Sequence, residues 1–375
     1  MGTKQRRLHL NLFLTAAGHH EGAWRHPDTD VTQLLEFDHF VRLARKAEEA
    51  KFDSLFMADR YSASKQAVAY GAMFGLEPLT LLTALAVATK RIGLIATLST
   101  SFNEPFNVAR RFASIDHLSK GRAGWNIITS GTDAEAQNFS YDQIPEHKDR
   151  YERAKEFVEV TTRLWDSWED EALVLDQEAG VYADSERVHE LNHRGRHFAV
   201  RGPLNVPRSP QGRPVLVQAG SSEDGRGFAA EVAEAIFTAQ QTLADAQAFY
   251  SDVKSRVARI GRNPEHVKIL PGICPIIGES EAEAKEKEAM LHELTNPKYS
   301  LLQLSNRVGF DLTSYPLDGP CPTCRRGSEP RSPEPYPAHY GAGAQRKPDA
   351  PRAAAPACRR TRAPHRCRHG QTGRR

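Results

Sequence analysis

Short apolar runs alternate with amphipathic segments along residues 8–294. Each run predicts a buried strand, and the apolar residues between the runs recur at helical spacing. The expected strands are Leu8–Leu14, Ser54–Ala58, Ile92–Leu98, Ala123–Ile128, Val215–Ala219, Ala235–Thr238 and Lys268–Ile273. The expected helices are Leu34–Ala50, Pro78–Thr89, Glu104–Leu118, Arg150–Trp168, Asp224–Ala233, Leu243–Ile260 and Glu281–Leu294. Strands and helices that alternate in this way favour a parallel sheet, either open or closed into a barrel.

The size of the repeating unit favours the barrel. Seven strands with roughly 30–45 residues per strand–helix unit suit a (β/α)₈ TIM barrel with one strand missing from the pattern. A doubly wound sheet usually has a Gly-x-Gly-x-x-Gly loop after its first strand, and none follows Leu14. A polar stretch interrupts the alternation at about residues 169–213. Such an insertion is either a loop excursion from an active site or a surface decoration.

Small polar residues end two neighbouring predicted strands. The segment from Arg91 to Ser130 forms one β-α-β unit, because two parallel strands need a crossover helix between them. Ligands bind α/β folds at the C-terminal ends of the strands. We therefore expect a functional rim at these polar strand ends, which are Thr97, Ser99 and Thr100 on one strand and Asn126, Thr129 and Ser130 on the other.

Three other places in the sequence contain candidate ligand-binding residues. Asp59 directly follows a strand, where it either binds a ligand or caps a turn. His147 and Tyr151 lie four residues apart near a helix start, which suits a phosphate group but is also an ordinary helix surface. A later strand runs through a glycine into Ser221 and Ser222, which either help to hold an anion or simply cap the next helix.

Charge and hydropathy divide the chain into two parts. Residues 321–375 contain no Leu, Ile, Val, Phe, Met or Trp, and they have twelve Arg and one Lys against three acidic residues. The net charge of this tail is +10, and the whole chain carries +3, so the preceding residues carry −7. A basic segment without core residues predicts a disordered tail. Incidental basic sequence explains it better than specific nucleic-acid binding, which usually adds interleaved aromatic residues.

Cysteine usage gives the same division. The residues before the tail contain a single cysteine, Cys274, which is typical of a reducing, cytoplasmic setting. The tail cysteines superficially resemble zinc ligands, but their spacing is irregular and no apolar residues surround them, so we expect no metal. The residues concerned are Cys321, Cys324, Cys358, Cys367 and His369. No apolar stretch approaches the ~20 residues that span a bilayer, and the N-terminal apolar run is better explained as a strand than as a signal peptide.

Four segments together resemble the bacterial luciferase-like flavin-dependent monooxygenases. They are FDSLFMAD (52–59), ATLSTSFNEPFNVARRFASIDHLSKGRAGWNIITS (96–130), EHKDRYERAKEFVEV (146–160) and RPVLVQAGSS (213–222). More narrowly, they resemble the branch that contains nitrilotriacetate monooxygenase component A, dibenzothiophene sulfone monooxygenase and the pristinamycin synthase large subunit. The resemblance extends from about residue 7 to about residue 319.

The resemblance implies the oxygenase of a two-component system. A separate NAD(P)H:flavin reductase would supply reduced FMN (FMNH2), and O2 would add to it as a C4a-hydroperoxide that oxygenates a small organic substrate at N, S or C. The protein would position the flavin and shield it from water. Members of this family are commonly homodimers. A non-catalytic flavin-binding or assembly subunit is the alternative within the same family.

The resemblance also assigns cofactor-binding residues. Asp59 and Thr97 would lie beside the flavin ring, and Asn126 would lie near the ring or the substrate. The residues expected to hold the ribityl phosphate are His147, Tyr151 and Ser221, with Ser222 nearby.

The resemblance ends after residue 319. Members of the family continue with further helices and a closing strand, whereas this chain continues with its Arg/Pro-rich tail. We therefore expect an incomplete barrel domain over residues 1–319 and a tail over residues 320–375 that could derive from a frameshift near codon 320. An incomplete barrel exposes the edges of its first and last strands. This predicts poor solubility and could leave the enzyme inactive.

Overall fold

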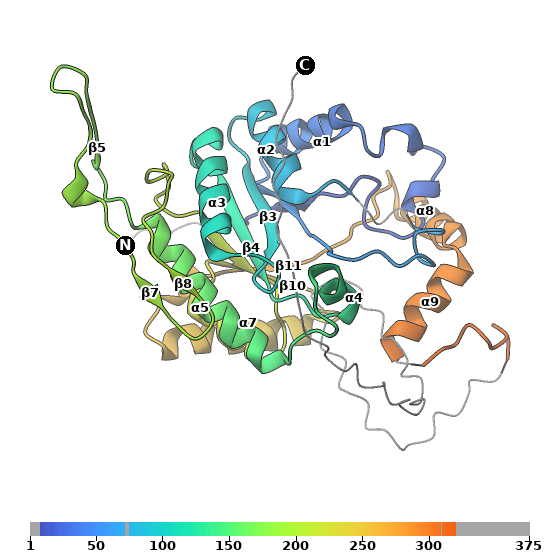
Figure 1. Cartoon of the computed structure of the whole chain (residues 1–375). Coiled ribbons are helices and arrows are strands. Elements are labelled where there is room, and N and C mark those ends of the chain that lie inside the picture. Colours follow the sequence, from blue (N-terminus) through green and yellow to red (C-terminus); the bar gives the residue numbers. More distant parts are fainter. Residues whose placement is uncertain (1–7, 72–74, 309, 320–375) are drawn as a thin grey trace, which may run out of the picture. The chain divides into compact units, whose positions relative to one another are not determined.

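The computed structural model describes residues 8–71, 75–308 and 310–319. At its centre is a sheet of parallel strands in the order β1-β2-β3-β4-β9-β10-β11 (Figure 1). These strands are β1 (Asn11–Phe13), β2 (Ser54–Met57), β3 (Gly93–Ser99), β4 (Ala123–Ile128), β9 (Val215–Gln218), β10 (Ala235–Thr238) and β11 (Lys268–Pro271). All seven predicted strands are therefore confirmed, and their order in the sheet follows their order in the sequence.

Helices connect the strands and cover the outside of the sheet (Figure 1). They are α1 (Phe37–Glu49), α2 (Pro78–Ala88), α3 (Pro105–Ser119), α4 (Asp133–Ala136), α5 (His147–Trp165), α6 (Glu223–Val232), α7 (Leu243–Arg259), α8 (Glu281–Leu294) and α9 (Pro297–Val308). Single 3₁₀ turns are formed by Ala23–Arg25, Val31–Gln33, Gln137–Phe139, Ser185–Arg187 and Pro264–His266. Proline occupies the first turn of α2 and of α3, where its missing amide hydrogen costs nothing. The short helix α4 and the helix α9 were not predicted.

Helix α5 begins and ends three residues earlier than the sequence predicts. Its first turn closes when the amide of Arg150 donates to the carbonyl of Glu146 at 3.0 Å. At the other end, the Ser167 hydroxyl donates to a carbonyl of the last turn at 2.6 Å. The indole of Trp168 then donates to the carbonyl of Leu204 at 2.8 Å, so this side chain belongs to the following segment. As a result, His147 is the first residue of the helix.

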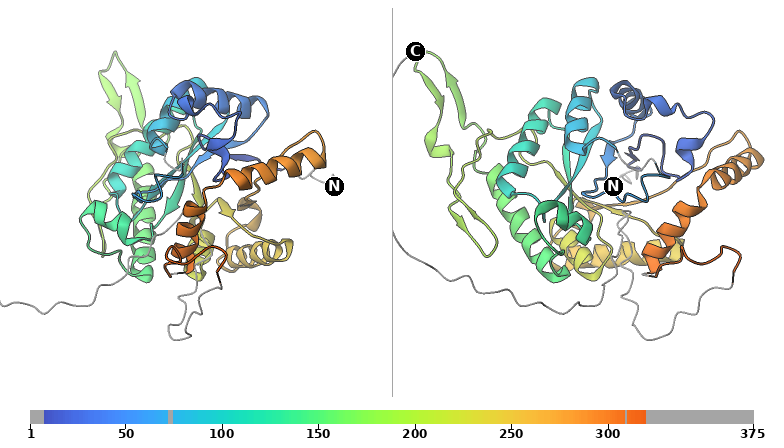
Figure 2. Two further views of the ribbon diagram at one scale, coloured as in Figure 1. Left: turned by 90° about the vertical axis from the view of Figure 1, so that its right-hand side faces the viewer. Right: turned by 45° about the vertical axis from the view of Figure 1, so that its right-hand side comes forward.

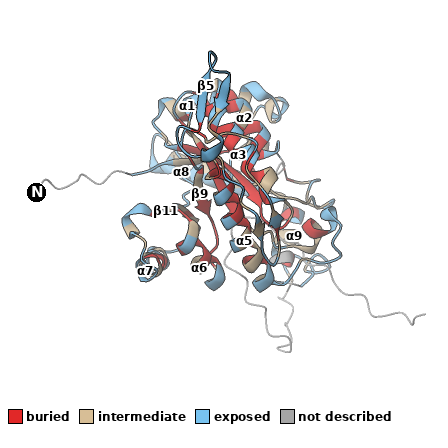
Figure 3. Cartoon of the chain, turned by 60° about the vertical axis from the view of Figure 1, so that its left-hand side comes forward, coloured by how far each residue is buried: buried red, intermediate tan, exposed pale blue. Residues whose placement is uncertain are grey.

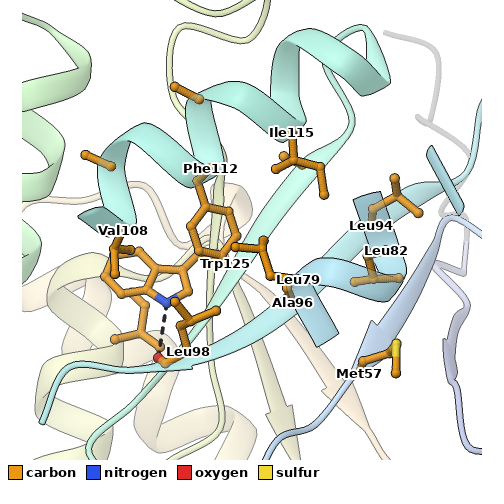
Figure 4. Close-up of a cluster of buried hydrophobic side chains, with 14 of the residues drawn as sticks. Met57, Leu79, Leu82, Leu94, Ala96, Leu98, Val108, Phe112, Ile115 and Trp125 are labelled. Carbon is orange, nitrogen blue, oxygen red and sulfur yellow. Dashed lines mark hydrogen bonds between the residues drawn. The ribbon is translucent and has the colours of Figure 1, made fainter. Parts of the chain in front are cut away.

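The outer face of the sheet packs against the helices in the largest of three hydrophobic clusters among the described residues. Trp125 of β4 is fully buried there, with ring centroids 5.8 Å from those of Phe112 on α3 and Phe157 on α5. Its indole nitrogen donates to the carbonyl of Leu98 at 3.2 Å (Figure 4). Buried residues concentrate on the strands and on the sides of the helices that face them (Figure 3). Burial of this face accounts for most of the hydrophobic stabilisation of the fold.

The inner face of the sheet forms a small separate core that shows how far the sheet curls. The rings of Phe13, Phe56 and Phe237 lie together, with centroids separated by 5.4 Å, 6.0 Å and 6.3 Å. Phe13 belongs to the first strand of the sheet and Phe237 to the sixth. The sheet therefore curves until strands near its opposite ends meet across the interior, which is the arrangement of a TIM barrel.

The barrel is nearly closed. Within the described residues, β1 pairs only with β2, and β11 pairs only with β10. The two strands therefore keep one unpaired edge each, as expected for seven strands. Helix α8 lies against the segment that follows β1 (Figure 2). A Cβ on Gly22 of that segment would lie 2.4 Å from the carbonyl oxygen of Leu291, so this position needs glycine.

The polar insertion carries two small antiparallel hairpins. These are β5 (Leu173–Asp176) with β6 (Val181–Ala183), and β7 (His193–Arg194) with β8 (Ala199–Val200). The first hairpin projects away from the barrel (Figure 1). The second is anchored on α5, where the Glu156 carboxylate accepts hydrogen bonds from the amides of His197 and Phe198, each at 2.9 Å. Near the end of the insertion, Gln211 donates to the buried carboxylate of Asp116 at 2.6 Å.

Two groups of expectations concern membranes and the tail. None of the described helices combines the length and hydropathy that crossing a membrane requires. The predicted tail of residues 320–375, with its cysteines and its proposed origin in a frameshift, lies outside the described residues.

Candidate functional site

A partly buried carboxyl group lies at the C-terminal end of β2. Asp59 comes two residues after the strand, and its Oδ1 accepts a hydrogen bond from the amide of Arg60 at 2.8 Å. Burial raises the pKa of Asp59 from 3.8 to about 6, and the negative charges of Glu77 and Glu135 act in the same direction. Hydrogen bonds from Arg60 and Tyr61 oppose this rise. Close to neutral pH, the carboxyl group can therefore both hold and release a proton.

The hydroxyl of Tyr61 lies beside this carboxyl group. It accepts hydrogen bonds from the amide of Ser99 at 3.2 Å and from Nδ2 of Asn103 at 3.4 Å. Burial raises the pKa of Tyr61 to about 12, and the negative charge of Asp59 adds to this. The phenol therefore keeps its proton at neutral pH and acts as a neutral hydrogen-bonding group.

Aromatic rings from three successive strand ends gather around Tyr61. Its ring lies edge-on to Phe102 at 5.9 Å and to Phe139 at 5.4 Å. Phe102 and Phe139 stack on each other at 4.6 Å with only 5° between their planes, and Tyr141 lies 6.2 Å from Phe102. We call these four residues the aromatic group. Such a group offers flat apolar surface for a ring-shaped ligand beside an ionisable carboxyl group.

Thr97 and Asn126 form a fully buried pair on neighbouring strands. They are aligned in the ladder between β3 and β4, and they are 0% and 1% exposed. The Thr97 hydroxyl donates to the carbonyl of Met57 at 2.7 Å, and Nδ2 of Asn126 donates to the Thr97 hydroxyl at 2.9 Å. The C-terminal ends of β2, β3 and β4 are thus tied together by side chains.

Helices α5 and α6 begin side by side at the ends of two paired strands. Helix α5 follows β4 after the short helix α4, and α6 directly follows β9, which pairs with β4. Nδ1 of His147 lies 2.9 Å from Oδ2 of Asp224 in the first turn of α6. One turn farther along, the rings of Tyr151 and Phe228 meet edge-on at 5.8 Å. The positive ends of two helix dipoles therefore lie together, which favours a bound anion.

Glycines allow the start of α6 to pack against Tyr151. A Cβ on Gly225 would lie 3.0 Å from both Tyr151 Oη and Ser222 Oγ, and a Cβ on Gly220 would lie 3.0 Å from the Cα of Gly225. Ser222 caps α6 by accepting a hydrogen bond from the Gly225 amide at 3.1 Å. Ser221 is 7% exposed. The hydroxyls of Tyr151 and Ser222 thus border a cradle that a single methyl group on Gly225 would fill.

Hydrogen bonds connect these helix starts to the aromatic group. Arg150, in the first turn of α5, donates to the carbonyl of Ser130 just after β4. The Ser130 hydroxyl donates to the Ser99 hydroxyl at 2.9 Å, and the Ser99 amide donates to Tyr61. Ser130 itself has a φ of 51°, an unusual value for a residue with a side chain. The strand ends and the helix starts therefore form one connected region of the protein.

The six residues predicted to bind a cofactor fall into two groups in this region. Asp59 and Thr97 lie at the strand ends. The helix-start group consists of His147, Tyr151, Ser221 and Ser222.

Sequence reasoning did not single out Tyr61, Glu135, Arg150 or Asp224. The pairing of Asp224 with His147 spans 77 residues and leaves no local signal. Among the described residues, no cluster of His, Cys, Asp or Glu side chains is placed to hold a metal ion.

Comparison with known proteins gives a consistent result. Residues 13–312 match the family described as luciferase-like monooxygenase. The chain is 50% identical over 323 residues to N-acetyl-S-(2-succino)cysteine monooxygenase of Bacillus subtilis (strain 168), covering 86% of this chain and 73% of that protein. It is 47% identical over 329 residues to nitrilotriacetate monooxygenase component A of Aminobacter aminovorans, covering 84% and 73%.

A solved structure extends the comparison to the fold. The structure of a riboflavin lyase with modified FMN and riboflavin superposes with a TM-score of 0.77 at 33% identity, covering 83% of this chain and 72% of that chain. The expected TIM barrel, the expected branch of the family and the expected enzyme class are thereby confirmed. This chain belongs to the luciferase-like monooxygenase family.

Proposed function

We propose that this protein is the oxygenase of a two-component flavin-dependent monooxygenase. It would take reduced FMN from a separate NAD(P)H:flavin reductase and use O2 to oxygenate a small organic substrate. Its similarity to nitrilotriacetate monooxygenase component A and to a riboflavin lyase solved with modified FMN supports this proposal. We further propose that it acts as a homodimer in the cytoplasm.

The observation that carries the proposal is the junction of α5 and α6. Two helix N-termini, the imidazole of His147 and the hydroxyls of Tyr151 and Ser222 converge there, with the imidazole held by Asp224 and with Ser221 directly before the capping serine. Helix amides, hydroxyls and an imidazole are the groups that proteins use to bind a phosphate monoester. We therefore assign His147, Tyr151 and Ser221 to the ribityl phosphate, with Ser222 contributing from its capping position.

The strand ends suit the ring system of the same cofactor. The aromatic group supplies flat apolar surface, and the hydrogen-bonded pair of Thr97 and Asn126 is buried. Asp59 and Thr97 would lie on the side of the ring. The residues present therefore fit FMN: its charged end at the helix starts and its flat end at the strand ends.

The protein's part in the reaction follows from these assignments. Reduced FMN, when bound, supplies the electrons with which O2 is activated. Asp59, with its pKa raised to about 6, is placed to hold or accept a proton at its carboxyl oxygens. The buried pair of Thr97 and Asn126 would keep water from the ring side. A non-catalytic flavin-binding subunit would need only the binding residues.

Rapid mixing of the flavin-loaded protein with O2 tests the proposal. The protein is first loaded anaerobically with reduced FMN, and reoxidation is then followed by flavin absorbance. A site that shields the flavin should slow reoxidation well below the rate for free reduced FMN. Reoxidation at the rate of free flavin, with flavin shown to be bound, would assign the protein to the non-catalytic alternative.

A further inference from the structure

We infer that Arg153 of α5 is a positioning residue of the candidate site. It joins the second hairpin of the polar insertion to residues 100–104, which we call the β3–α3 loop, and so holds Asn103 against Tyr61. This inference rests on the proposed function, because the loop borders the proposed flavin site. It also gives the insertion a role: its second hairpin belongs to the framework of the site and is not a surface decoration.

The β3–α3 loop supplies two side chains to the candidate site. Phe102 stacks on Phe139 within the aromatic group, with ring centroids 4.6 Å apart. Nδ2 of Asn103 donates to the carbonyl of Ser99 at 2.8 Å and to the hydroxyl of Tyr61 at 3.4 Å. A displacement of this loop would therefore disturb both the aromatic group and the hydrogen bonds of the Tyr61 hydroxyl.

Arg153 holds this loop by its backbone. Its Nε donates to the carbonyl of Thr100 at 3.2 Å, and its Nη2 donates to the carbonyl of Asn103 at 3.3 Å. A planar guanidinium group presents its donors in a fixed geometry, which suits two neighbouring acceptors. Within the described residues, Arg153 has no ion pair with a carboxylate, so its charge is directed to the loop carbonyls and to an aromatic ring.

That ring comes from the insertion. The guanidinium carbon of Arg153 lies 4.3 Å from the ring centroid of Phe198, within the range of a cation–π contact. Phe198 is buried and packs edge-on against Phe157 of α5, with ring centroids 5.4 Å apart. Its amide donates to the Glu156 carboxylate at 2.9 Å. The second hairpin therefore presents a fixed aromatic face that supports the guanidinium group.

The path of the hairpin along α5 brings this ring to the site. The helix after a barrel strand runs back toward the end where the strands begin, so the insertion, which follows α5, starts on the side opposite to the β3–α3 loop. The hairpin then follows α5 back (Figure 1). Arg163 lies 3.3 Å from Nδ1 of His193, whose Nε2 lies 3.0 Å from Glu156, and Arg196 pairs with Glu152 one turn earlier. The insertion thus reaches the end of the barrel at which the candidate site lies.

Hydrogen exchange tests the hold on the loop without any ligand. Arg153→Met keeps an unbranched side chain but removes its donors and its charge. Arg163 is the matched control: it lies on the same helix and donates to the carbonyl of Leu191 in the insertion at 3.2 Å, but in the described part of the chain it makes no hydrogen bond to the loop. Arg153→Met should speed exchange of the amides of residues 99–101 by at least about fivefold, and Arg163→Met should leave it unchanged. Exchange at the wild-type rate in Arg153→Met would overturn the inference.

The affinity for reduced flavin tests the link from the loop to the site. Dissociation constants for reduced FMN and reduced riboflavin are measured anaerobically. Arg153→Met should weaken the binding of both by the same factor, about fivefold, because the loop borders the proposed ring side and not the phosphate. Arg153→Lys, which keeps the charge and a donor, should recover part of this loss. Phe198→Leu should weaken binding in the same direction, and Arg163→Met should bind like wild type.

A double variant decides whether Arg153 acts through Asn103. If it does, Arg153→Met combined with Asn103→Ala should bind reduced flavin no more weakly than the weaker of the two single variants. Multiplication of the two losses, wild-type binding by Arg153→Met, or an equal loss in Arg163→Met would each overturn the inference. If the wild type binds neither flavin, the proposed function has failed, and hydrogen exchange still tests the hold on the loop. If Arg153→Met does not fold, Phe198→Leu decides: wild-type exchange at residues 99–101 in that variant would overturn the inference.

Discussion

Nδ1 of His147 lies 2.9 Å from Oδ2 of Asp224, across the first turns of two helices that start at neighbouring strands. Through this contact, a residue predicted to bind phosphate is held by a residue that the sequence did not indicate. The imidazole is therefore fixed before any ligand arrives, which lowers the entropic cost of binding.

Two glycines of α6 provide a direct test of the cradle at the helix starts. A methyl group on Gly225 would press against Tyr151 Oη and Ser222 Oγ at 3.0 Å, whereas Gly227 has nothing within 4 Å of its would-be Cβ. We expect Gly225→Ala to weaken FMN binding by at least about tenfold. Gly227→Ala should bind normally and raise the free energy of unfolding by up to about 1 kcal/mol through helix propensity. Equal FMN affinity in the two variants would contradict the cradle.

The raised pKa of Asp59 predicts a pH-dependent cost to stability. Because folding raises this pKa from 3.8 to about 6, the native state binds the proton more tightly than the unfolded chain. Stability is therefore lost as the pH rises from about 4 to about 6, by at most about 3 kcal/mol. Asp59→Asn removes this pH-dependent cost. In urea unfolding, the free energy of unfolding of Asp59→Asn should therefore exceed that of wild type by an amount that grows from about pH 4 to about pH 6 and then stays constant. Parallel pH profiles for the two proteins would argue against a buried carboxyl group with a raised pKa.

The anchoring of the second hairpin predicts a local effect of Glu156. Its side chain is 13% exposed and accepts two amide hydrogen bonds, whereas Glu159 on the same helix is 58% exposed and pairs with Arg163 at 3.6 Å. Glu156→Ala should lower the free energy of unfolding by about 2–3 kcal/mol. It should also speed hydrogen exchange at the amides of His197 and Phe198. Glu159→Ala should change neither, and similar exchange in both variants would refute the anchoring role.

The unpaired edge of β1 predicts self-association. Leu8, just before this strand, is 88% exposed, and Val87 on α2 is 81% exposed. A charge beside a strand edge hinders edge-to-edge pairing, whereas a charge on a helix surface does not. Leu8→Lys should therefore reduce concentration-dependent association measured by light scattering, with little change in Val87→Lys. An equal effect of both substitutions would point to general hydrophobicity instead.

The sequence predicted the framework of this fold better than its site. Each of the seven strands is a short apolar run bounded by polar residues, so burial and backbone pairing coincide in the pattern. The same pattern indicated Asp59, Thr97 and His147 as candidate site residues, because parallel strands direct their C-terminal ends to one side.

Contacts between distant segments were not predictable in this way. The bond from Arg150 to the Ser130 carbonyl and the stacking of Phe102 on Phe139 depend on how loops of different strands meet. The early start of α5 was missed for a related reason. The first turn is supported by the contact of His147 with Asp224 in α6, which no local pattern indicates.

The affinity for FMN relative to riboflavin, measured anaerobically with the reduced flavins, tests the central claim most directly. Riboflavin lacks only the phosphate, and His189, which pairs with Glu169 on the insertion, gives a matched control for His147. We predict that wild type and His189→Ala bind reduced FMN at least about tenfold more tightly than reduced riboflavin, and that His147→Ala loses most of this preference. Equal affinities for the two flavins in the wild type, or a preference unchanged in His147→Ala, would contradict the assignment of the phosphate to the junction of α5 and α6.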